Sequence, residues 1–320
     1  MFKNPRISYG GDSYIVLEYS IDFELEANFK VNLITELLRE RKIPGVIEVI
    51  PSIVGLMVHY DPLVIPPKKL IDEIRFLNEE VEKAATSTVK SRFIELPILF
   101  NDKWSLECQQ KFKDYHNTGD VPNIKFIAKE NGIHVKEVIR RLIQPQWWIV
   151  FIGFTPGLSW SAPVGIRKEE MLQASKYKKP RLWTPVGTVS IGGVYIAIYS
   201  VTHPGGYQLF GRTPVPVVIY DERCNPEKPL DIFKNNPCLN VTSDRLKWKP
   251  ISFEEYLKTE ELVKEGKYQY HIKEQPFDVT HYFARPVEYI RELEEKAGYR
   301  QDLKDQIEFA YTQFEGDLLR

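Results

Sequence analysis

Cysteine and methionine are both scarce in this sequence. Its 320 residues include three cysteines and three methionines. Cys108, Cys224 and Cys238 form no CxxC pair, so neither a zinc ribbon nor a thioredoxin-like motif is indicated. Their small, odd number also argues against the disulfide scaffold of a small secreted protein.

The chain also lacks a charge excess and a long apolar run. It has 43 Lys and Arg residues against 44 Asp and Glu residues, and the basic ones form no stripe interleaved with aromatics. We therefore expect no nucleic-acid partner. Apolar runs such as residues 147–154 are too short to cross a bilayer, and the N-terminus has no apolar signal core. These features predict a cytoplasmic protein without a membrane segment.

Several signature motifs of nucleotide and metal enzymes are absent. No GxGxxG follows a predicted strand, and no HExxH or EF-hand pattern occurs. Residues 187–192 have the glycine spacing of a Walker A loop, but Gly193 and Val194 stand where Lys and Ser or Thr are required. The six histidines are scattered. We predict no metal site and no nucleotide site in this chain alone.

The first part of the chain has the pattern of a small α+β domain. Its length and its 43% hydrophobic residues allow two domains. Apolar spacing predicts helices around residues 31–38 and 67–81, and strand composition marks residues 14–19, 46–50, 56–60 and 93–99. This β-α-β-β-α-β order is typical of a split βαβ sandwich. The small, polar residues 84–90 are the predicted hinge.

The second part has the pattern of short strands with dense Gly and Pro punctuation. After helices at residues 106–115 and 135–142, strands are predicted at residues 148–152, 189–191, 195–199 and 215–220. This pattern favours a closed or nearly closed barrel over a parallel sheet. The tail is predicted to be helical, with a capping box at Ser252 and Glu255 and a break at Gly298.

Three loop segments of the second part carry the candidate site residues. They are residues 153–160, 176–185 and 203–214, and each combines Gly and Pro with polar or aromatic side chains. Glycine lets backbone N–H groups approach a ligand closely. Gln208 offers a donor and an acceptor to an amide, and Arg212 can grip a carboxylate through a two-point fork.

We select Lys176, His203 and Arg212 as candidate catalytic residues. A desolvated Lys176 would shift its pKa and act as an acid or base, and His203 can titrate near neutral pH. The alternative is that Lys176 is a solvated surface residue and Arg212 an internal ion-pair partner. The candidate substrate-binding residues are Thr155, Tyr177, Arg181, Gly205, Gly206, Tyr207 and Gln208.

The most specific segment is residues 204–214, PGGYQLFGRTP. It resembles a signature of the family of allophanate hydrolase subunit 1, the Kip kinase inhibitor and the B component of 5-oxoprolinase. The same sequence type forms the second half of the carboxyltransferase domain of biotin-dependent urea carboxylase, which this chain resembles above all. Further matching segments are residues 45–48, 59–61, 122–127, 183–185 and 249–252, so the resemblance covers nearly the whole chain.

We expect an α+β fold in three parts. The resemblance implies the first two, a ferredoxin-like domain over residues 1–90 and a cyclophilin-like β-barrel carboxyltransferase domain over residues 91–251. The third, a helical extension over residues 252–320, is predicted from the residue pattern itself. The resemblance also implies an obligate partner, a subunit 2 homologue, with the active site near the junction of the two.

The leading functional hypothesis is a carboxyltransferase subunit that acts on urea, guanidine or a related amide nitrogen. Biotin and ATP would belong to biotin carrier and biotin carboxylase proteins, because this chain has no Met-Lys-Met biotinylation sequence. The resemblance leaves two alternatives open. One is a subunit of an ATP-dependent amidohydrolase, and the other is a Kip-type inhibitor of a histidine kinase.

This sequence departs from the family pattern at two places. His203 stands where family members usually have Ser, and Leu158, Ser159 and Trp160 replace the usual Phe-Pro-Tyr. Both places lie in the loop segments selected above. The departures therefore bear on the substrate rather than on the fold.

Overall fold

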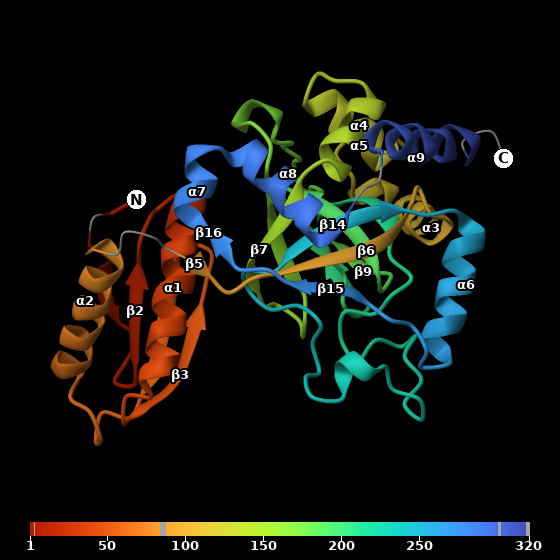
Figure 1. The fold of residues 1–320 in the computed structure, drawn as a ribbon. Coiled ribbons are helices and arrows are strands. Elements are labelled where there is room, and N and C mark those ends of the chain that lie inside the picture. Colours follow the sequence, from red (N-terminus) through yellow and green to blue (C-terminus); the bar gives the residue numbers. More distant parts are fainter. Residues whose placement is uncertain (3, 84–87, 300–301, 318–320) are drawn as a thin grey trace. The chain divides into compact units, whose positions relative to one another are not determined.

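The computed structural model describes residues 1–2, 4–83, 88–299 and 302–317. The chain forms two compact units (Figure 1). The first contains residues 1–91 and 276–284, and the second contains residues 92–275 and 285–320. The predicted third part, residues 252–320, thus contributes segments to both units, and the three-part division stays a proposal.

The first unit is an antiparallel four-stranded sheet with two helices on one face. The sheet order is β1-β2-β4-β3. Its elements are β1 (Arg6–Tyr9), β2 (Tyr14–Glu18), α1 (Leu25–Arg41), β3 (Val46–Pro51), β4 (Gly55–Tyr60) and α2 (Pro67–Lys83). Alternate residues of β2, namely Ile15 and Leu17, are fully buried in one core with Ile34 of α1 and Leu70 of α2. The four-stranded sheet and its two helices confirm the layers of the ferredoxin-like prediction, but the element order is β-β-α-β-β-α in place of the predicted β-α-β-β-α-β.

One predicted strand of the first unit was wrong. The edge place beside β2 is taken by the N-terminal β1, and residues 93–99 belong to β6 (Arg92–Phe100) of the second unit. Most of β6 is buried on both sides, so its apolar run carries no period that would assign it to a sheet. Of the predicted hinge, residues 84–87 lie outside the described residues, and β5 (Thr88–Val89) pairs with β16 (Phe277–Asp278).

The second unit is built on a closed barrel. Its strand order is β13-β10-β11-β8-β7-β14-β6, and β6 pairs again with β13. The remaining barrel strands are β7 (Gln146–Ile152), β8 (Ser159–Val164), β10 (Thr188–Gly192), β11 (Tyr195–Ile198), β13 (Gln208–Arg212) and β14 (Arg245–Pro250). A further strand, β15 (His271–Glu274), extends the sheet from β6. This closed architecture confirms the barrel prediction.

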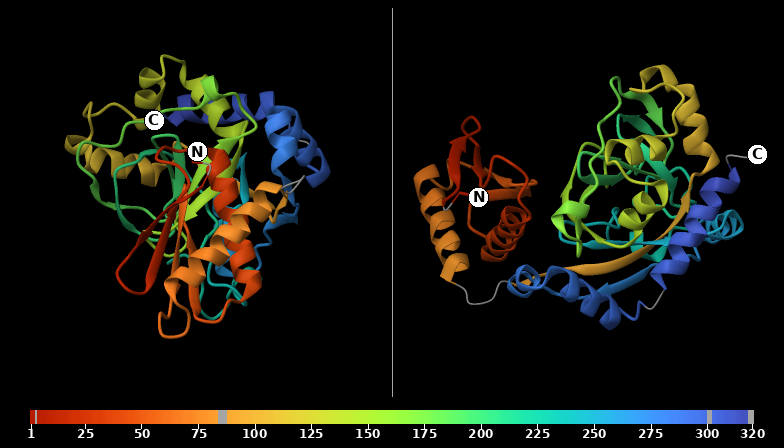
Figure 2. Two further views of the ribbon diagram at one scale, coloured as in Figure 1. Left: turned by 90° about the vertical axis from the view of Figure 1, so that its left-hand side faces the viewer. Right: turned by 90° about the horizontal axis from the view of Figure 1, so that it is seen from above.

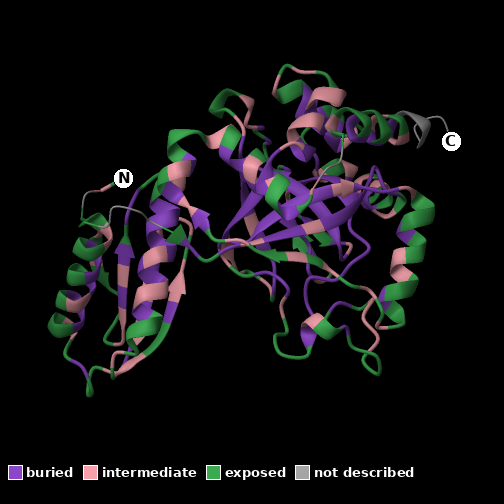
Figure 3. Ribbon diagram, in the orientation of Figure 1, coloured by how far each residue is buried: buried purple, intermediate pink, exposed green. Residues whose placement is uncertain are grey.

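Helices surround the barrel, and their outer faces are exposed while the barrel strands are buried (Figure 3). The helices are α3 (Lys103–Lys111), α4 (Asn123–Glu130), α5 (Val135–Ile143), α6 (Phe253–Lys264), α8 (Pro286–Ala297) and α9 (Leu303–Asp317), and α7 (Val279–Ala284) belongs to the first unit. Helix α9 lies along α5 (Figures 1 and 2). The predicted capping box at Ser252 is present, and Gly298 ends α8 in the left-handed conformation.

A second predicted strand, residues 215–220, is also wrong. Val215, Val217 and Val218 are buried core residues, but the segment runs as a loop with a single bridge from Val218 to Cys238. Pro214 and Pro216 remove the backbone donors that a ladder needs. The apolar pattern here reflects burial of a loop rather than a strand.

Candidate functional site

The three loop segments meet around one cavity of the second unit. The cavity has a volume of about 520 Å³, within the range of small-molecule sites. Its walls are mostly apolar or aromatic, with Lys176 as the one fully charged lining side chain. The lining residues are Phe154, Leu158, Trp160, Lys176, Tyr177, Pro180, Ala197, Tyr199, His203, Pro204, Gly205, Gly206 and Tyr207.

A two-stranded arm carries one side of the cavity. It consists of β9 (Arg181–Thr184) and β12 (His203–Gly205), which pair antiparallel. Gly205 is required where the arm passes Tyr199, because a Cβ at this position would lie 1.9 Å from the Tyr199 hydroxyl. The backbone N–H of Tyr177 donates to Gly206 O at 2.7 Å, which joins the second loop segment to the third.

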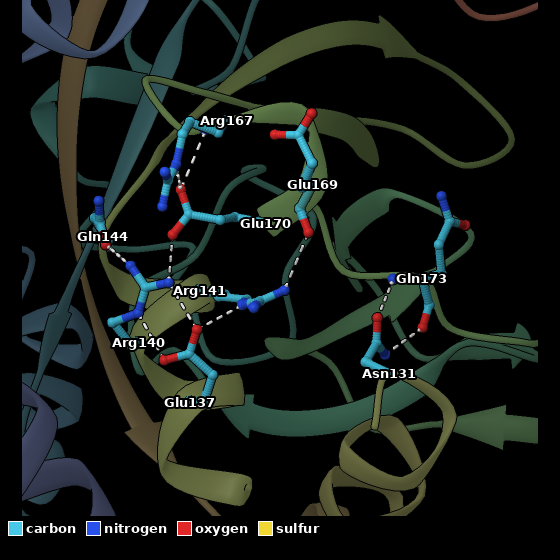
Figure 4. Close-up of polar contacts among 9 residues, drawn as sticks. All are labelled: Asn131, Glu137, Arg140, Arg141, Gln144, Arg167, Glu169, Glu170 and Gln173. Atoms are coloured by element: carbon cyan, nitrogen blue, oxygen red, sulfur yellow. Dashed lines mark hydrogen bonds and ion pairs between the residues drawn. The ribbon is translucent and has the colours of Figure 1, made fainter. Parts of the chain in front are cut away.

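The segment that leads to Lys176 is anchored on α4 and α5 (Figure 4). Arg140 of α5 donates to Glu137 and to Glu170, at 2.7 Å and 2.6 Å. Arg140, with Arg167, lowers the pKa of the Glu170 carboxyl to about 2. Further along, the Asn131 side chain donates to the backbone carbonyl of Gln173 at 2.7 Å and accepts from its N–H at 3.0 Å (Figure 4). These contacts fix the approach of the loop to the cavity.

His203 is a buried histidine on the cavity wall, 8% exposed. Its Nδ1 lies 2.6 Å from Pro204 O, which assigns the ring proton of the neutral form to Nδ1. Its Nε2 is buried and has no hydrogen-bond partner among the described residues. Burial lowers the pKa of His203, the hydrogen bond to Pro204 raises it, and the charge of Arg181 lowers it further. The imidazole is therefore neutral near pH 7, with Nε2 as an unused acceptor.

Two aromatic rings enclose this imidazole. Tyr199 stacks on it with ring centroids 4.6 Å apart, and Phe154 meets it edge-on at 5.3 Å. Phe154 is 73% exposed and has a φ of 71°, which is rare for a bulky residue. A strained residue of this kind is typical of functional sites.

Arg181 lies directly behind the cavity wall and is fully buried. Its Nη1 donates to Tyr207 O at 2.9 Å, its Nη2 to the Tyr199 hydroxyl at 3.1 Å, and its Nε to Thr184 Oγ1 at 3.2 Å. The guanidinium carbon lies 4.4 Å from the centroid of the Tyr177 ring. Arg181 thus holds three aromatic wall residues in place.

Lys176 and Tyr207 lie together on the wall. The Lys176 ammonium is 5.4 Å from the centroid of the Tyr207 ring, and the lysine side chain is exposed. Burial raises the pKa of Tyr207 to about 12, so its hydroxyl stays protonated. Tyr177 donates its hydroxyl to Asn123 Oδ1 at 3.0 Å and presents its ring to the cavity.

Besides Arg181, three predicted site residues are not on the cavity wall. Gln208 is buried with Nε2 donating to Ser175 O and Oε1 2.9 Å from His116 Nε2, so both ends of its amide are used. Arg212 donates to Val186 O at 2.8 Å and lies over the Trp104 ring, and burial lowers its pKa. Thr155 faces Ser200, with their hydroxyl oxygens 3.4 Å apart. This geometry favours structural roles for Gln208 and Arg212.

The site residues selected from the sequence leave out four of the larger wall residues: Phe154, Leu158, Trp160 and Tyr199. The first three stand in the first loop segment, which the sequence pattern already assigned to the site, so their position in that segment could have identified them. Tyr199 directly follows β11, and only the fold shows that it stacks on His203.

Two absences hold for the part of the chain that the structure describes. No group of three or more His, Cys, Asp or Glu side chains is placed to hold a metal ion there. Among the same residues, no helix is long and apolar enough to cross a membrane.

The residues around this cavity lie in the part of the chain that matches a known protein family. Residues 5–230 match the model of a family described as carboxyltransferase domain, subdomains C and D. The chain belongs to this family. The matched range includes the barrel strands from β6 to β13 and all three loop segments around the cavity.

Relatives of this carboxyltransferase family are found in proteins of very different length. A urea amidolyase of Lachancea kluyveri is 28% identical over 92% of this chain, which spans 16% of that protein. The B component of 5-oxoprolinase from Bacillus subtilis is 24% identical over 78% of this chain and 95% of that protein. The structure of Kluyveromyces lactis urea carboxylase superposes on 98% of the chain with a TM-score of 0.73 at 24% identity, which supports the fold; the chain spans 28% of that protein.

Proposed function

We propose that this chain supplies one half of a carboxyltransferase active site in a multi-subunit biotin-dependent carboxylase. The acceptor is the nitrogen of urea, guanidine or a related amide. The observation that carries the proposal is the aromatic cavity, which is built from the three loop segments of a carboxyltransferase family and contains one unused acceptor, His203 Nε2.

The residues of this cavity fit the handling of an amide-type N–H. His203 is neutral and offers Nε2 to an N–H of the acceptor. Lys176 on the wall faces the negative charge that develops as the nitrogen gains a carboxyl group. The apolar walls around the buried His203 strengthen its interaction with a bound N–H, whereas the exposed Lys176 acts through a charge that solvent screens.

We assign the carboxyl donor and its ATP-dependent formation to partners, either separate proteins or further domains of a longer protein. It spans only 16% of the urea amidolyase relative, and none of Met1, Met57 and Met171 belongs to a Met-Lys-Met sequence. Carboxybiotin on a carrier protein would deliver the carboxyl group, and a biotin carboxylase would use ATP to form it. A subunit 2 homologue would complete the active site.

Affinity purification of the tagged chain from its native cell tests the proposal. Mass spectrometry and a streptavidin blot identify the co-purifying proteins. A biotinylated partner together with a subunit 2 homologue is the expected result. Recovery of a sensor kinase alone would contradict both enzyme hypotheses.

The second candidate is a subunit of an ATP-dependent amidohydrolase. It is favoured by the match to the B component of 5-oxoprolinase, because that separate protein is covered over 95% of its length. Avidin distinguishes the two candidates in the purified complex. It should block carboxyl transfer through biotin, whereas amide hydrolysis coupled to ATP should be unaffected.

A further inference from the structure

We propose that this cavity binds a substrate that carries a negative charge on an apolar body, that is, a small organic carboxylate. The inference rests on the proposed function only in taking this cavity for the substrate site. It names the class of substrate and ranks anionic amides above neutral urea and cationic guanidine.

The first support is the distribution of charge along the chain. The whole protein is nearly balanced, with a formal net charge of −1. From Met171 to Tyr220, however, the sequence contains no Asp or Glu at all. The same stretch supplies most of the cavity wall. Its basic residues are Lys176, Lys178, Lys179, Arg181 and Arg212.

The second support is the environment of Arg181. This side chain is 0% exposed, and its three hydrogen bonds all go to neutral oxygens. Among the described residues, no carboxylate lies within ion-pair distance of it. Burying a charge without a counter-charge is costly, because the protein interior solvates ions poorly. An anionic ligand in the cavity would offset this cost.

Two other cations of the same unit are neutralised. Arg223 forms an ion pair with Asp221 at 2.6 Å, and both side chains are nearly inaccessible. Lys247, beside a separate hollow of about 660 Å³, pairs with Glu294 at 2.8 Å.

Arg212 is also buried without a carboxylate at ion-pair distance among the described residues, but it contacts Val186 O and the Trp104 ring, which lie outside the cavity wall. Arg181 differs from it because two of its hydrogen bonds go to wall residues, Tyr199 and Tyr207.

The charge of Arg181 reaches the cavity through the wall residues that it contacts. Tyr177, Tyr199 and Tyr207 are each in contact with the guanidinium, and each lines the cavity. Electrostatic interactions decay slowly across such an apolar layer. At the surface, Lys176 adds a second positive charge.

The acidic residue Glu130 lies near Lys176 and opposes the positive charge at this part of the cavity wall. Glu130 of α4 accepts from the backbone N–H of Ser175 at 2.8 Å, next to Lys176 in the sequence. Glu130 is exposed, so solvent and salt screen its charge. It offsets part of the field of Lys176 but has no contact with Arg181, and the buried positive charge remains.

The chemistry of the wall defines the rest of the ligand. The side chains of Leu158, Pro180 and Ala197 offer only apolar surface to a bound molecule. In a carboxylate on a small ring or chain, the charge is attracted by Arg181 and Lys176 and the apolar body contacts this surface. A guanidinium or ammonium group would be repelled by Arg181 and Lys176.

A matched ligand pair tests the inference on the purified chain. Cyclopentanecarboxylate and cyclopentanecarboxamide have nearly the same shape and differ in charge, and their dissociation constants can be measured by isothermal titration calorimetry or ligand-observed NMR. We expect the carboxylate to bind at least about tenfold tighter, a difference of about 1.4 kcal/mol. Equal affinities would overturn the inference. So would the absence of carboxylate binding at about 10 mM, well above usual Michaelis constants.

Variants then assign the effect to Arg181. Arg181→Gln should reduce the preference for the carboxylate over the carboxamide to about twofold or less. The readout is the ratio of the two dissociation constants, because the loss of the contacts to Tyr199 and Tyr207 affects the binding of both ligands. Circular dichroism monitors whether this variant folds. If it does not fold, the ligand pair on the wild-type chain still decides the inference.

The outcome separates this inference from the proposed function. Carboxylate preference without any biotinylated partner would leave the anionic site standing and remove the carboxylase proposal. A biotinylated partner with equal binding of the two ligands would leave the carboxylase proposal and remove the anionic substrate.

Discussion

Two of the buried arginines of the barrel unit, Arg223 and Arg181, have opposite surroundings. Arg223 donates to both carboxylate oxygens of Asp221, at 2.9 Å and 2.6 Å, so its charge is neutralised inside the fold. Arg181 donates only to two neutral side-chain oxygens and a backbone carbonyl, behind the wall of the cavity. The charge of an arginine in an ion pair is largely cancelled by its carboxylate, so it exerts little attraction on a ligand. An arginine that is hydrogen-bonded but has no carboxylate partner keeps a positive electrostatic potential around it, and this potential can attract an anionic ligand.

The largest expected effect comes from making Arg223 resemble Arg181. Asp221→Asn leaves the Arg223 charge buried without its carboxylate, which should lower the free energy of unfolding by about 3–5 kcal/mol. Chemical denaturation measures this loss. The control is Asp231→Asn, which removes an exposed pair with Lys234 and should have no measurable effect. A tolerated Asp221→Asn would mean that Arg223 does not need its partner.

The next prediction disturbs the hydrogen bond between Arg181 and Tyr199. Gly205→Ala places a Cβ 1.9 Å from the Tyr199 hydroxyl, so Tyr199 must move and the contact with Arg181 is lost. We expect a loss of about 1–3 kcal/mol in unfolding free energy and weaker carboxylate binding.

Gly206→Ala is the matched control for this substitution. A Cβ at this position meets nothing closer than 3.8 Å, so stability should change by less than about 0.5 kcal/mol. Thermal unfolding of both variants gives the comparison. Equal behaviour of the two alanines would contradict the packing described around Tyr199.

A pH-dependent effect should follow from His203. Its pKa is lowered in the folded chain by burial, so the unfolded chain binds this proton first as the pH falls. The contribution of the neutral His203 to the free energy of unfolding is therefore fully present above the ordinary pKa of 6.5 and declines as the pH falls below it. His203→Gln should make the decline shallower. His116, whose pKa is also lowered by burial, contributes equally to both proteins. An unchanged pH slope of unfolding free energy would count against a neutral, buried His203.

The smallest predicted effect concerns Lys176. Because this side chain is exposed, salt screens its charge, and Lys176→Gln should weaken carboxylate binding only about two- to threefold at low ionic strength. Lys178→Gln is the matched control, since Lys178 is exposed two residues away and does not line the cavity. A larger loss at Lys178 than at Lys176 would show that the cavity is not where the anion binds.

Much of the fold could be predicted from local patterns. Helices α1 and α2 of the first unit follow from apolar spacing, and three of its strands follow from strand composition. The Gly and Pro punctuation of the second part indicated a barrel. Strand β6 was assigned to the wrong sheet because a strand buried on both sides carries no facing signal. Residues 215–220 were mistaken for a strand because a buried loop is as apolar as a strand.

The candidate site could be predicted in outline but not in its inner arrangement. The loop motifs indicated Lys176, His203, Gly205, Gly206 and Tyr207, all of which line the cavity. Gln208 begins β13, whose five residues are all buried, and the boundary between loop and strand is not visible in the sequence. Nor does the sequence reveal whether a buried arginine has a carboxylate partner, because that depends on contacts between distant segments.

The most direct test of the field in the cavity is an NMR titration of His203 on the wild-type chain. The pKa of His203 is measured alone, with saturating cyclopentanecarboxylate and with cyclopentanecarboxamide. A bound carboxylate should offset the charge of Arg181 and raise the pKa of His203, and the carboxamide should not raise it. The same pKa in the presence of either ligand would contradict the account of an unneutralised arginine behind the cavity wall.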